Sequence, residues 1–148
     1  MQSSNSYFIG IDGGGTKTEA FLCDQHGRMM ERTLTGSTNL KSRSEKEVYD
    51  SIKSMMARFT NSLHKDNIKG IYVSTAGGDR IEDRTRWKKW IAEVFPDFSG
   101  FIVVNNDAYG ALASGTFSME GNVLIAGTGS IAYSVIFGES PQRIGGWG

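Results

Sequence analysis

Residues 7–23, with the sequence YFIGIDGGGTKTEAFLC, decide how this chain folds. An apolar run at residues 7–11 leads into three glycines at positions 13–15, and an alternating segment follows at residues 18–23. Because alternation is typical of strands, the stretch predicts a β-hairpin. Its glycine turn leaves backbone N–H groups bare enough to approach an anion.

A second glycine turn repeats this arrangement near the C-terminal end of the sequence. Residues 123–126 are apolar, residues 127–130 read Gly-Thr-Gly-Ser, and an alternating segment follows at residues 131–137. Two such hairpins in one chain, the first carrying Asp12 and Thr16, predict a clamp for phosphate groups. For either turn alone, an ordinary hairpin with turn glycines stays open as an alternative.

Neither turn fits two better known phosphate-binding motifs. Gly10 and Gly15 have the separation of a Walker A loop, but Thr16 intervenes before Lys17 and the turn feeds a strand instead of a helix. Residues 127–132 fit a dinucleotide-binding pattern, yet they also lead into a strand, and no acidic residue follows about twenty positions later. We therefore reject both interpretations.

The composition excludes several classes of partner. The formal net charge is zero, so no basic surplus points to nucleic acid. No run approaches the roughly 18 consecutive apolar residues of a membrane-spanning helix, and the first residues lack the plan of a signal peptide. Cys23 is the only cysteine, so no internal disulfide can form. We expect a cytoplasmic protein without nucleic-acid or membrane partners.

The hydrophobic pattern predicts an α/β fold. Ser44 and Glu47 form a capping box, and the helix that begins there is expected to bury one face as far as Leu63. The strands at residues 71–74 and 101–104 lack alternation, so both faces are expected to be covered. The predicted elements are strands over residues 7–12, 18–24, 28–35, 71–74 and 101–104, and helices after 44, around 87–94 and over 108–115.

The strand pattern restarts late in the sequence. After a glycine-containing join near residues 117–121, a strand, a turn and a second strand follow, with a third short strand near Arg143 and Ile144. We therefore predict a first domain over residues 1–117 and an incomplete second lobe over residues 118–148.

Two carboxylates, those of Asp12 and Asp107, lie at the ends of predicted strands and are candidates for metal binding and catalysis. Asp12 ends an apolar strand beside the first glycine turn, where it could hold Mg²⁺ through water, and Thr16 adds a hydroxyl for phosphate oxygens. Asp107 follows a strand and precedes a helix, so it could cap that helix or act as a general base. Taken alone, capping is the simpler interpretation for Asp107. Asp79, in a glycine connector, is expected to cap the next helix.

Together these motifs resemble those of the N-acetylglucosamine kinase and BadF/BadG-type ATPase family, within the actin, hexokinase and Hsp70 superfamily. Single motifs are moderate signals, whereas the whole set in the same order is a strong one. The matching stretches are residues 9–18, 37–39, 76–79, 106–108, 127–130 and 145–148.

The resemblance implies a ribonuclease H-like, actin-like ATPase lobe with a mixed sheet, and ATP and Mg²⁺ as cofactors. In that family the ATP phosphates sit between the two glycine hairpins, which here are Gly13, Gly14, Gly15, Thr16 and Lys17 in the first and Gly127, Thr128, Gly129 and Ser130 in the second. The metal lies near the residue matching Asp12. The residue matching Asp107 takes the proton of the sugar 6-hydroxyl, and those matching Asn39, Thr128, Gly146 and Trp147 line the sugar pocket.

The resemblance also implies a second lobe beyond residue 148. We therefore expect the N-terminal half of an amino-sugar kinase, inactive alone because its C-terminal lobe is missing. Its late hairpin should pair with another chain, as in a homodimer, fold back on its own lobe, or be disordered. N-acetylglucosamine, N-acetylmuramic acid and glucosamine all stay open as substrates. An activator ATPase that drives electron transfer to a dehydratase is an alternative, although Cys23 is a poor iron–sulfur ligand. A sugar-sensing protein of the same fold is another.

Overall fold

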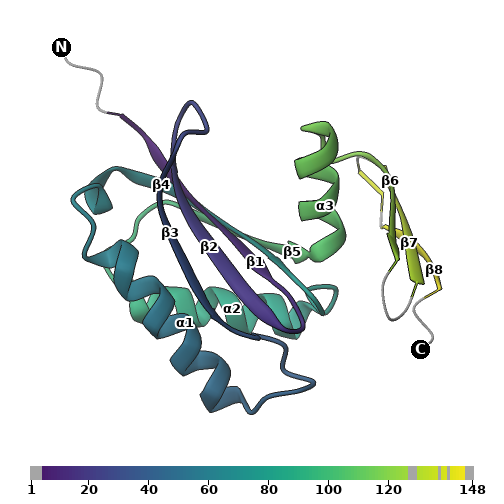
Figure 1. Cartoon of the computed structure of the whole chain (residues 1–148), viewed down its shortest axis with the longest axis horizontal. Helices are drawn as coiled ribbons and strands as arrows, with labels where there is room; N and C mark the ends of the chain where they lie inside the picture. Colours follow the sequence, from purple (N-terminus) through teal and green to yellow (C-terminus); the bar gives the residue numbers. More distant parts are fainter. Residues whose placement is uncertain (1–4, 127–129, 137, 140, 146–148) are drawn as a thin grey trace. The chain divides into compact units, whose positions relative to one another are not determined.

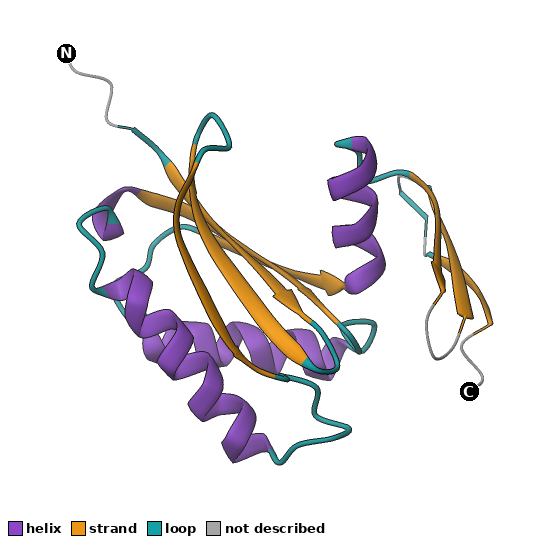
Figure 2. Ribbon diagram, in the orientation of Figure 1, coloured by secondary structure: helices purple, strands orange, loops and turns teal. Residues whose placement is uncertain are grey.

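The computed structural model describes residues 5–126, 130–136, 138–139 and 141–145. The chain divides into two compact units, Met1–Asp107 and Ala108–Gly148. Figure 1 traces the elements along the chain, and Figure 2 separates helices from strands. In order, they are β1 (Tyr7–Gly13), β2 (Lys17–Asp24), β3 (Met29–Gly36), α1 (Glu45–Thr60), a 3-10 turn (Lys65–Asn67), β4 (Ile68–Thr75), α2 (Ile81–Val94), β5 (Phe101–Asn106), α3 (Asp107–Thr116), β6 (Gly121–Ala126), β7 (Ser130–Val135) and β8 (Gln142–Gly145).

The first unit is built on a five-stranded mixed sheet with the strand order β3-β2-β1-β4-β5. The strand β2 runs antiparallel to both of its neighbours, β1 and β3, and the β1–β2 pair confirms the predicted hairpin. The strands β1, β4 and β5 are parallel, and helices connect β3 to β4 and β4 to β5. The predicted α/β class and element order are therefore confirmed.

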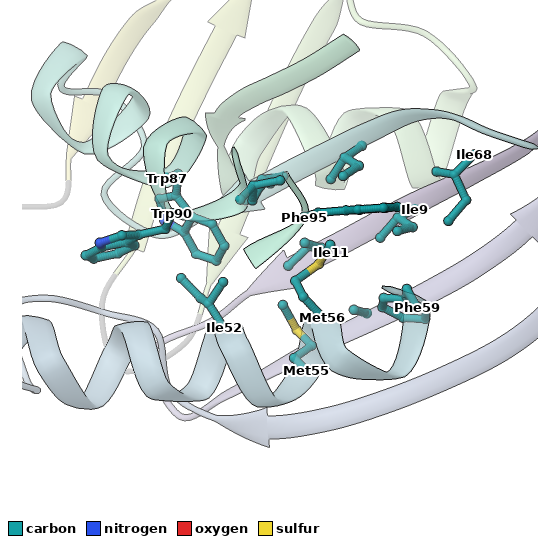
Figure 3. Packing of buried hydrophobic residues seen from close by; sticks show 14 of the residues in the cluster. Ile9, Ile11, Ile52, Met55, Met56, Phe59, Ile68, Trp87, Trp90 and Phe95 are labelled. Carbon is teal, nitrogen blue, oxygen red and sulfur yellow. The ribbon is translucent and has the colours of Figure 1, made fainter. Parts of the chain in front are cut away.

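One face of this sheet carries the core (Figure 3). Along β1, Tyr7, Ile9 and Ile11 are buried while Phe8 and Asp12 are exposed, as a strand with one covered face requires. The helices α1 and α2 lie on the covered face (Figure 1). They contribute the buried side chains Val48, Ile52, Met55, Met56 and Phe59 from α1, and Trp87, Trp90 and Ile91 from α2.

The start of α1 follows the predicted capping box. The Ser44 side chain accepts a hydrogen bond from the Glu47 backbone, and the Glu47 carboxylate accepts from the Ser44 backbone N–H at 2.9 Å. The hydrogen bonds from Ser44 hold the pKa of the Glu47 carboxyl below its usual value. The predicted end is wrong, because α1 stops at Thr60 and Leu63 is 97% exposed.

The edge strand β5 is less buried than expected. Phe101 is 56% exposed, whereas Val104 is buried in the core. The ring of Phe101 lies over Gly70 of the neighbouring β4, at a position that a side chain on Gly70 would fill. The expectation that both faces of residues 101–104 are covered is therefore wrong for Phe101 in the first unit.

The second unit contains a three-stranded antiparallel sheet with the order β6-β7-β8. The strand β8 confirms the third short strand predicted near Arg143 and Ile144. Tyr133 and Val135 of β7 are buried. In the sequence, the boundary between the compact units falls between Asp107 and Ala108, at the start of α3, whereas the boundary predicted from the sequence follows α3.

Phe59→Ala should lower the free energy of unfolding by about 3–5 kcal/mol, because it removes a fully buried ring from the core between α1 and the sheet. Leu63→Ala is the matched control. It lies just beyond the same helix and is 97% exposed, so its effect should stay within about 0.5 kcal/mol. Urea unfolding followed by the fluorescence of the buried Trp87 and Trp90 measures both. Equal losses would contradict the described core.

Candidate functional site

Polar residues gather where three neighbouring parallel strands end. In the sheet register, Asp12 of β1 pairs with Ser74 of β4, which pairs with Asn105 of β5. One position further on, Gly13 pairs with Thr75, which pairs with Asn106. Open α/β sheets bind their ligands at the carboxyl ends of strands. This polar edge of the sheet is therefore the candidate site in the first unit.

The first glycine turn is packed tightly against its neighbours. The Gly14 N–H donates to the Lys17 carbonyl at 2.9 Å, which closes the hairpin. A Cβ on Gly13 would lie 2.8 Å from Thr75 Oγ1 and 2.9 Å from Thr38 Oγ1. A side chain at position 13 would therefore collide with these hydroxyls, which explains the glycine there. Gly15 and Thr16, by contrast, are exposed at the tip of the turn.

The two charged residues of the hairpin differ in their surroundings. Asp12 is exposed at the end of β1. The Lys17 ammonium lies 2.8 Å from Glu19 Oε1, and the same oxygen accepts from Arg32 at 2.7 Å. These bonds, that from Lys17 first, lower the pKa of the Glu19 carboxyl. Because the Lys17 side chain is 63% exposed, the pair contributes little to stability and leaves Lys17 free to exchange partners.

The loop at residues 37–39 is bound directly to the hairpin. The Ser37 hydroxyl donates to the Gly14 carbonyl at 3.2 Å and accepts from the Asn39 N–H at 3.1 Å. The buried hydroxyls of Thr18 and Thr38 lie 2.8 Å apart. As a result Asn39 faces the turn, with its Nδ2 atom 4.0 Å from where a Cβ on Gly15 would be.

The segment before Asp107 is held by the loop that follows β4. Asn106 is 2% exposed, and its side-chain amide donates to Asp79 Oδ1 at 2.8 Å. The predicted capping role of Asp79 is wrong, because Arg80 is the N-cap residue of α2. Asp107 itself is half-buried and is the first residue of α3. Because Asp107 lies at the junction of β5 and α3, its position is compatible with either role predicted from the sequence, capping the helix or acting as a general base.

Buried hydroxyls that were not predicted from the sequence join these segments. Thr75 donates to the Gly13 carbonyl at 3.3 Å, and Ser74 donates to the Asn106 carbonyl at 3.4 Å. The only sequence feature that could have indicated these hydrogen bonds is the pair of hydroxyl residues, Ser74 and Thr75, that ends a largely apolar strand. That feature is weak evidence by itself. Their partners are distant in sequence, so no local pattern could identify them.

The structure brings together the first hairpin, Asn39 and the residues that end β4 and β5. Ser130 is exposed at the start of β7, in the second unit. Five predicted site residues lie outside the described residues, and they are Gly127, Thr128, Gly129, Gly146 and Trp147.

The donor set limits which metal the site could hold. Within the described ranges, no group of three or more His, Cys, Asp or Glu side chains could enclose a metal ion. Asp12 offers a single exposed carboxylate. That arrangement fits Mg²⁺, which keeps several waters and binds through one or two carboxylates together with substrate phosphates. It does not fit a site built entirely from protein ligands.

Comparison with protein families gives one clear match. The model of the BadF/BadG/BcrA/BcrD ATPase family matches residues 9–148. Separately, no helix in the described part of the chain is long and apolar enough to cross a membrane.

Individual relatives point in the same direction. The chain is 34% identical over 144 residues to an N-acetylmuramic acid/N-acetylglucosamine kinase of Clostridium acetobutylicum, covering 96% of this chain and 46% of the relative. It is 32% identical over 155 residues to an N-acetyl-D-glucosamine kinase of Dictyostelium discoideum, covering 98% and 48%. The chain thus spans about half the length of these relatives.

A solved structure supports the fold. The structure is that of a putative N-acetylglucosamine kinase from Porphyromonas gingivalis, with a TM-score of 0.75 and 21% identity, covering 93% of this chain and 47% of that chain. The predicted actin-like architecture agrees with this likeness.

Gly13→Ala should lower the free energy of unfolding by about 1–3 kcal/mol, because the new methyl group would displace the hydrogen-bonded hydroxyls of Thr38 and Thr75. Gly10→Ala is the matched control on the same strand, since a Cβ there meets no atom within 4 Å. Its effect should stay below about 1 kcal/mol. Chemical denaturation of both variants measures the two free energies of unfolding. Similar losses in the two variants would show that the close approach at Gly13 does not contribute to stability.

Proposed function

This chain belongs to the BadF/BadG/BcrA/BcrD ATPase family, and on that premise we propose that it is the N-terminal half of an ATP-dependent amino-sugar kinase acting on the sugar 6-hydroxyl. The observation that carries the proposal is the polar edge of the sheet. There Asp12 and Ser74 are paired in register, and Asp107 follows the end of the adjacent β5. The kinase names of the two relatives support it.

The first hairpin is assigned to the phosphates. Phosphoryl transfer depends on positioning and on neutralising charge, and backbone N–H groups in a glycine turn do both. Gly13, Gly14, Gly15 and Thr16 would supply this surface, with the exposed Lys17 as a mobile cation. Gly127, Thr128, Gly129 and Ser130 are assigned to the same phosphates on the family resemblance alone.

Asp12 is assigned to the metal. Its exposed carboxylate would hold Mg²⁺ through bound water, and the ion would neutralise charge on the β- and γ-phosphates. Asp12 belongs to a paired strand, so its backbone is fixed by neighbours on both sides. A rigid backbone suits a residue that would hold the metal in a fixed position during phosphoryl transfer.

Asp107 is assigned the role of general base. Its carboxylate would accept the proton of the 6-hydroxyl as that oxygen forms a bond to the γ-phosphorus and the bond to the ADP oxygen breaks. The hydrogen bonds made by Ser74 and Asn106 fix the preceding backbone. Asn39, Asp107, Thr128, Gly146 and Trp147 are assigned to sugar binding.

Two other functions compete with this proposal. An activator ATPase would share the hairpins but needs cysteines to hold an iron–sulfur cluster, and burial raises the pKa of the Cys23 thiol, which disfavours the thiolate a metal needs. A sugar-sensing protein would bind sugar without transferring phosphate. Iron content and ADP release distinguish the three.

The direct test is a kinase screen of a full-length version that includes the proposed C-terminal lobe. ADP release should depend on N-acetylglucosamine, N-acetylmuramic acid or glucosamine, and phosphate should appear on the 6-oxygen by NMR. The chain of residues 1–148 should give no turnover, because the proposed C-terminal lobe would supply one wall of the nucleotide site and help to exclude water. Sugar-independent ATP hydrolysis, or turnover by residues 1–148, would contradict the proposal.

Asp107→Asn in the full-length protein should reduce sugar phosphorylation by about 10²-fold or more, the usual contribution of a general base. The fold should survive, because Asn is also well tolerated at the start of a helix. Steady-state kinetics and a thermal melt measure the two effects. Near-normal turnover would remove Asp107 from the mechanism.

Asp12→Ala should weaken the use of Mg²⁺ and ATP far more than it weakens sugar binding, since its carboxylate is assigned to the metal and not to the sugar. Separate titrations of nucleotide and sugar into the variant measure the difference. An equal loss of both affinities would mean that Asp12 supports the fold instead of the metal.

A further inference from the structure

Two adjacent hydroxyl residues connect the proposed sugar-binding loop to the proposed phosphate hairpin. The Ser37 hydroxyl occupies the space between them, because it accepts from the Asn39 N–H and donates to the Gly14 carbonyl. Thr38 is 2% exposed, and its hydroxyl meets that of Thr18, which is fully buried at the start of β2. The loop is thus bound to the glycine turn and to the second strand of the hairpin.

We propose that Ser37 and Thr38 are positioning residues that set the place of Asn39 relative to the phosphate hairpin. This inference rests on the proposed function, because it concerns how the same site aligns its two substrates. Neither residue is assigned to contact sugar or nucleotide. Both act through neighbours, Ser37 through Asn39 and Gly14, and Thr38 through Thr18.

The chemistry of these positions supports a specific role over simple packing. A buried hydroxyl costs free energy unless it is hydrogen-bonded, and Ser37, Thr38 and Thr18 all find partners in other hydroxyls or the backbone. Apolar residues of similar size would fill the space without fixing direction. Hydrogen bonds are directional, so they fix both the distance and the orientation of Asn39.

The hairpin and the loop each have supports of their own, and the hydroxyls of Ser37 and Thr38 bond the loop to the hairpin. The hairpin is held by its own ladder, by the Gly14 to Lys17 bond and by Thr75 on the Gly13 carbonyl. The loop is held internally, with the Lys41 N–H on Asn39 Oδ1 and Arg43 Nη1 on the Ser37 carbonyl. Loss of the Ser37 hydroxyl removes the bond from the loop to the Gly14 carbonyl, so it should loosen the loop relative to the hairpin and leave the hairpin itself in place.

The chain offers a closely matched control in Ser62. This serine is also buried, its hydroxyl donates to Glu31 at 2.6 Å, and it accepts from the backbone N–H two residues later, at His64. Ser37 makes the same pair of bonds, to a distant oxygen and to the N–H of Asn39. Ser62 lies before β4, away from the strand ends that carry the polar edge. Its removal should affect stability and not substrate alignment.

The experiment compares Ser37→Ala, Thr38→Val, Thr38→Ser and Ser62→Ala in the full-length protein, with N-acetylglucosamine and Mg²⁺-ATP as probes. Ser37→Ala and Thr38→Val should raise the KM for the sugar roughly three- to tenfold, the size expected for one lost hydrogen bond, and lower kcat. The KM for ATP should change by less than about twofold, which is below the effect of one hydrogen bond. Thr38→Ser retains the hydroxyl and should restore the sugar KM, and Ser62→Ala should leave both constants unchanged.

Hydrogen exchange of the Asn39 backbone amide is the second readout, and it does not depend on catalysis. Exchange should be faster in Ser37→Ala and unchanged in Ser62→Ala. The same kinetic profile for both serine variants, or unchanged exchange at Asn39 in Ser37→Ala, would overturn the positioning role. If the unmodified protein phosphorylates no amino sugar, the proposed function fails, and the exchange result alone then decides whether Ser37 positions the loop.

Discussion

The close approach at Gly13 is the constraint on which the polar edge of the first unit depends. The end of β1, the end of β4 and the loop after β3 meet at this residue, where the hydroxyls of Thr75 and Thr38 occupy the space of a side chain. Any other residue would push these segments apart. The register of β1 and β4 places Asp12 beside Ser74, and the missing side chain at Gly13 leaves room for the loop that carries Asn39 to lie against the turn.

The core gives this constraint a rigid base. The buried side chains of α1 and α2 pack on one face of the five-stranded sheet and fix the strands in register. The strand ends then carry the polar groups, where their bonds to one another replace bonds to water. Stability and function are thus separated along each strand, with apolar residues such as Ile9 and Val73 toward the middle and hydroxyl, amide or carboxyl residues at the carboxyl end.

Local pattern was enough for the hairpin, the capping box at Ser44 and the order of strands and helices. The local pattern gave wrong predictions where contacts between residues distant in sequence determine the structure. Leu63 continues the apolar face of α1 in sequence, but the helix ends before reaching it. Asp79 precedes a helix, as a capping residue would, but its carboxylate accepts a hydrogen bond from the side chain of Asn106, which is distant in sequence. The pairing of Thr18 with Thr38 likewise depends on how β2 and the later loop meet in space. The expected roles of Thr128, Gly146 and Trp147 came from family resemblance alone.

We propose that the carboxyl ends of β1, β4 and β5 form the phosphate and metal side of a kinase site. A crystal structure of the full-length protein with Mg²⁺ and a non-hydrolysable ATP analogue would show whether they do. We expect phosphate oxygens within hydrogen-bond distance of the backbone N–H groups of residues 13–17, and a magnesium-bound water on the Asp12 carboxylate. A nucleotide bound elsewhere, with residues 12–17 making no contact to phosphate or metal, would show that this edge of the sheet is not the phosphate site.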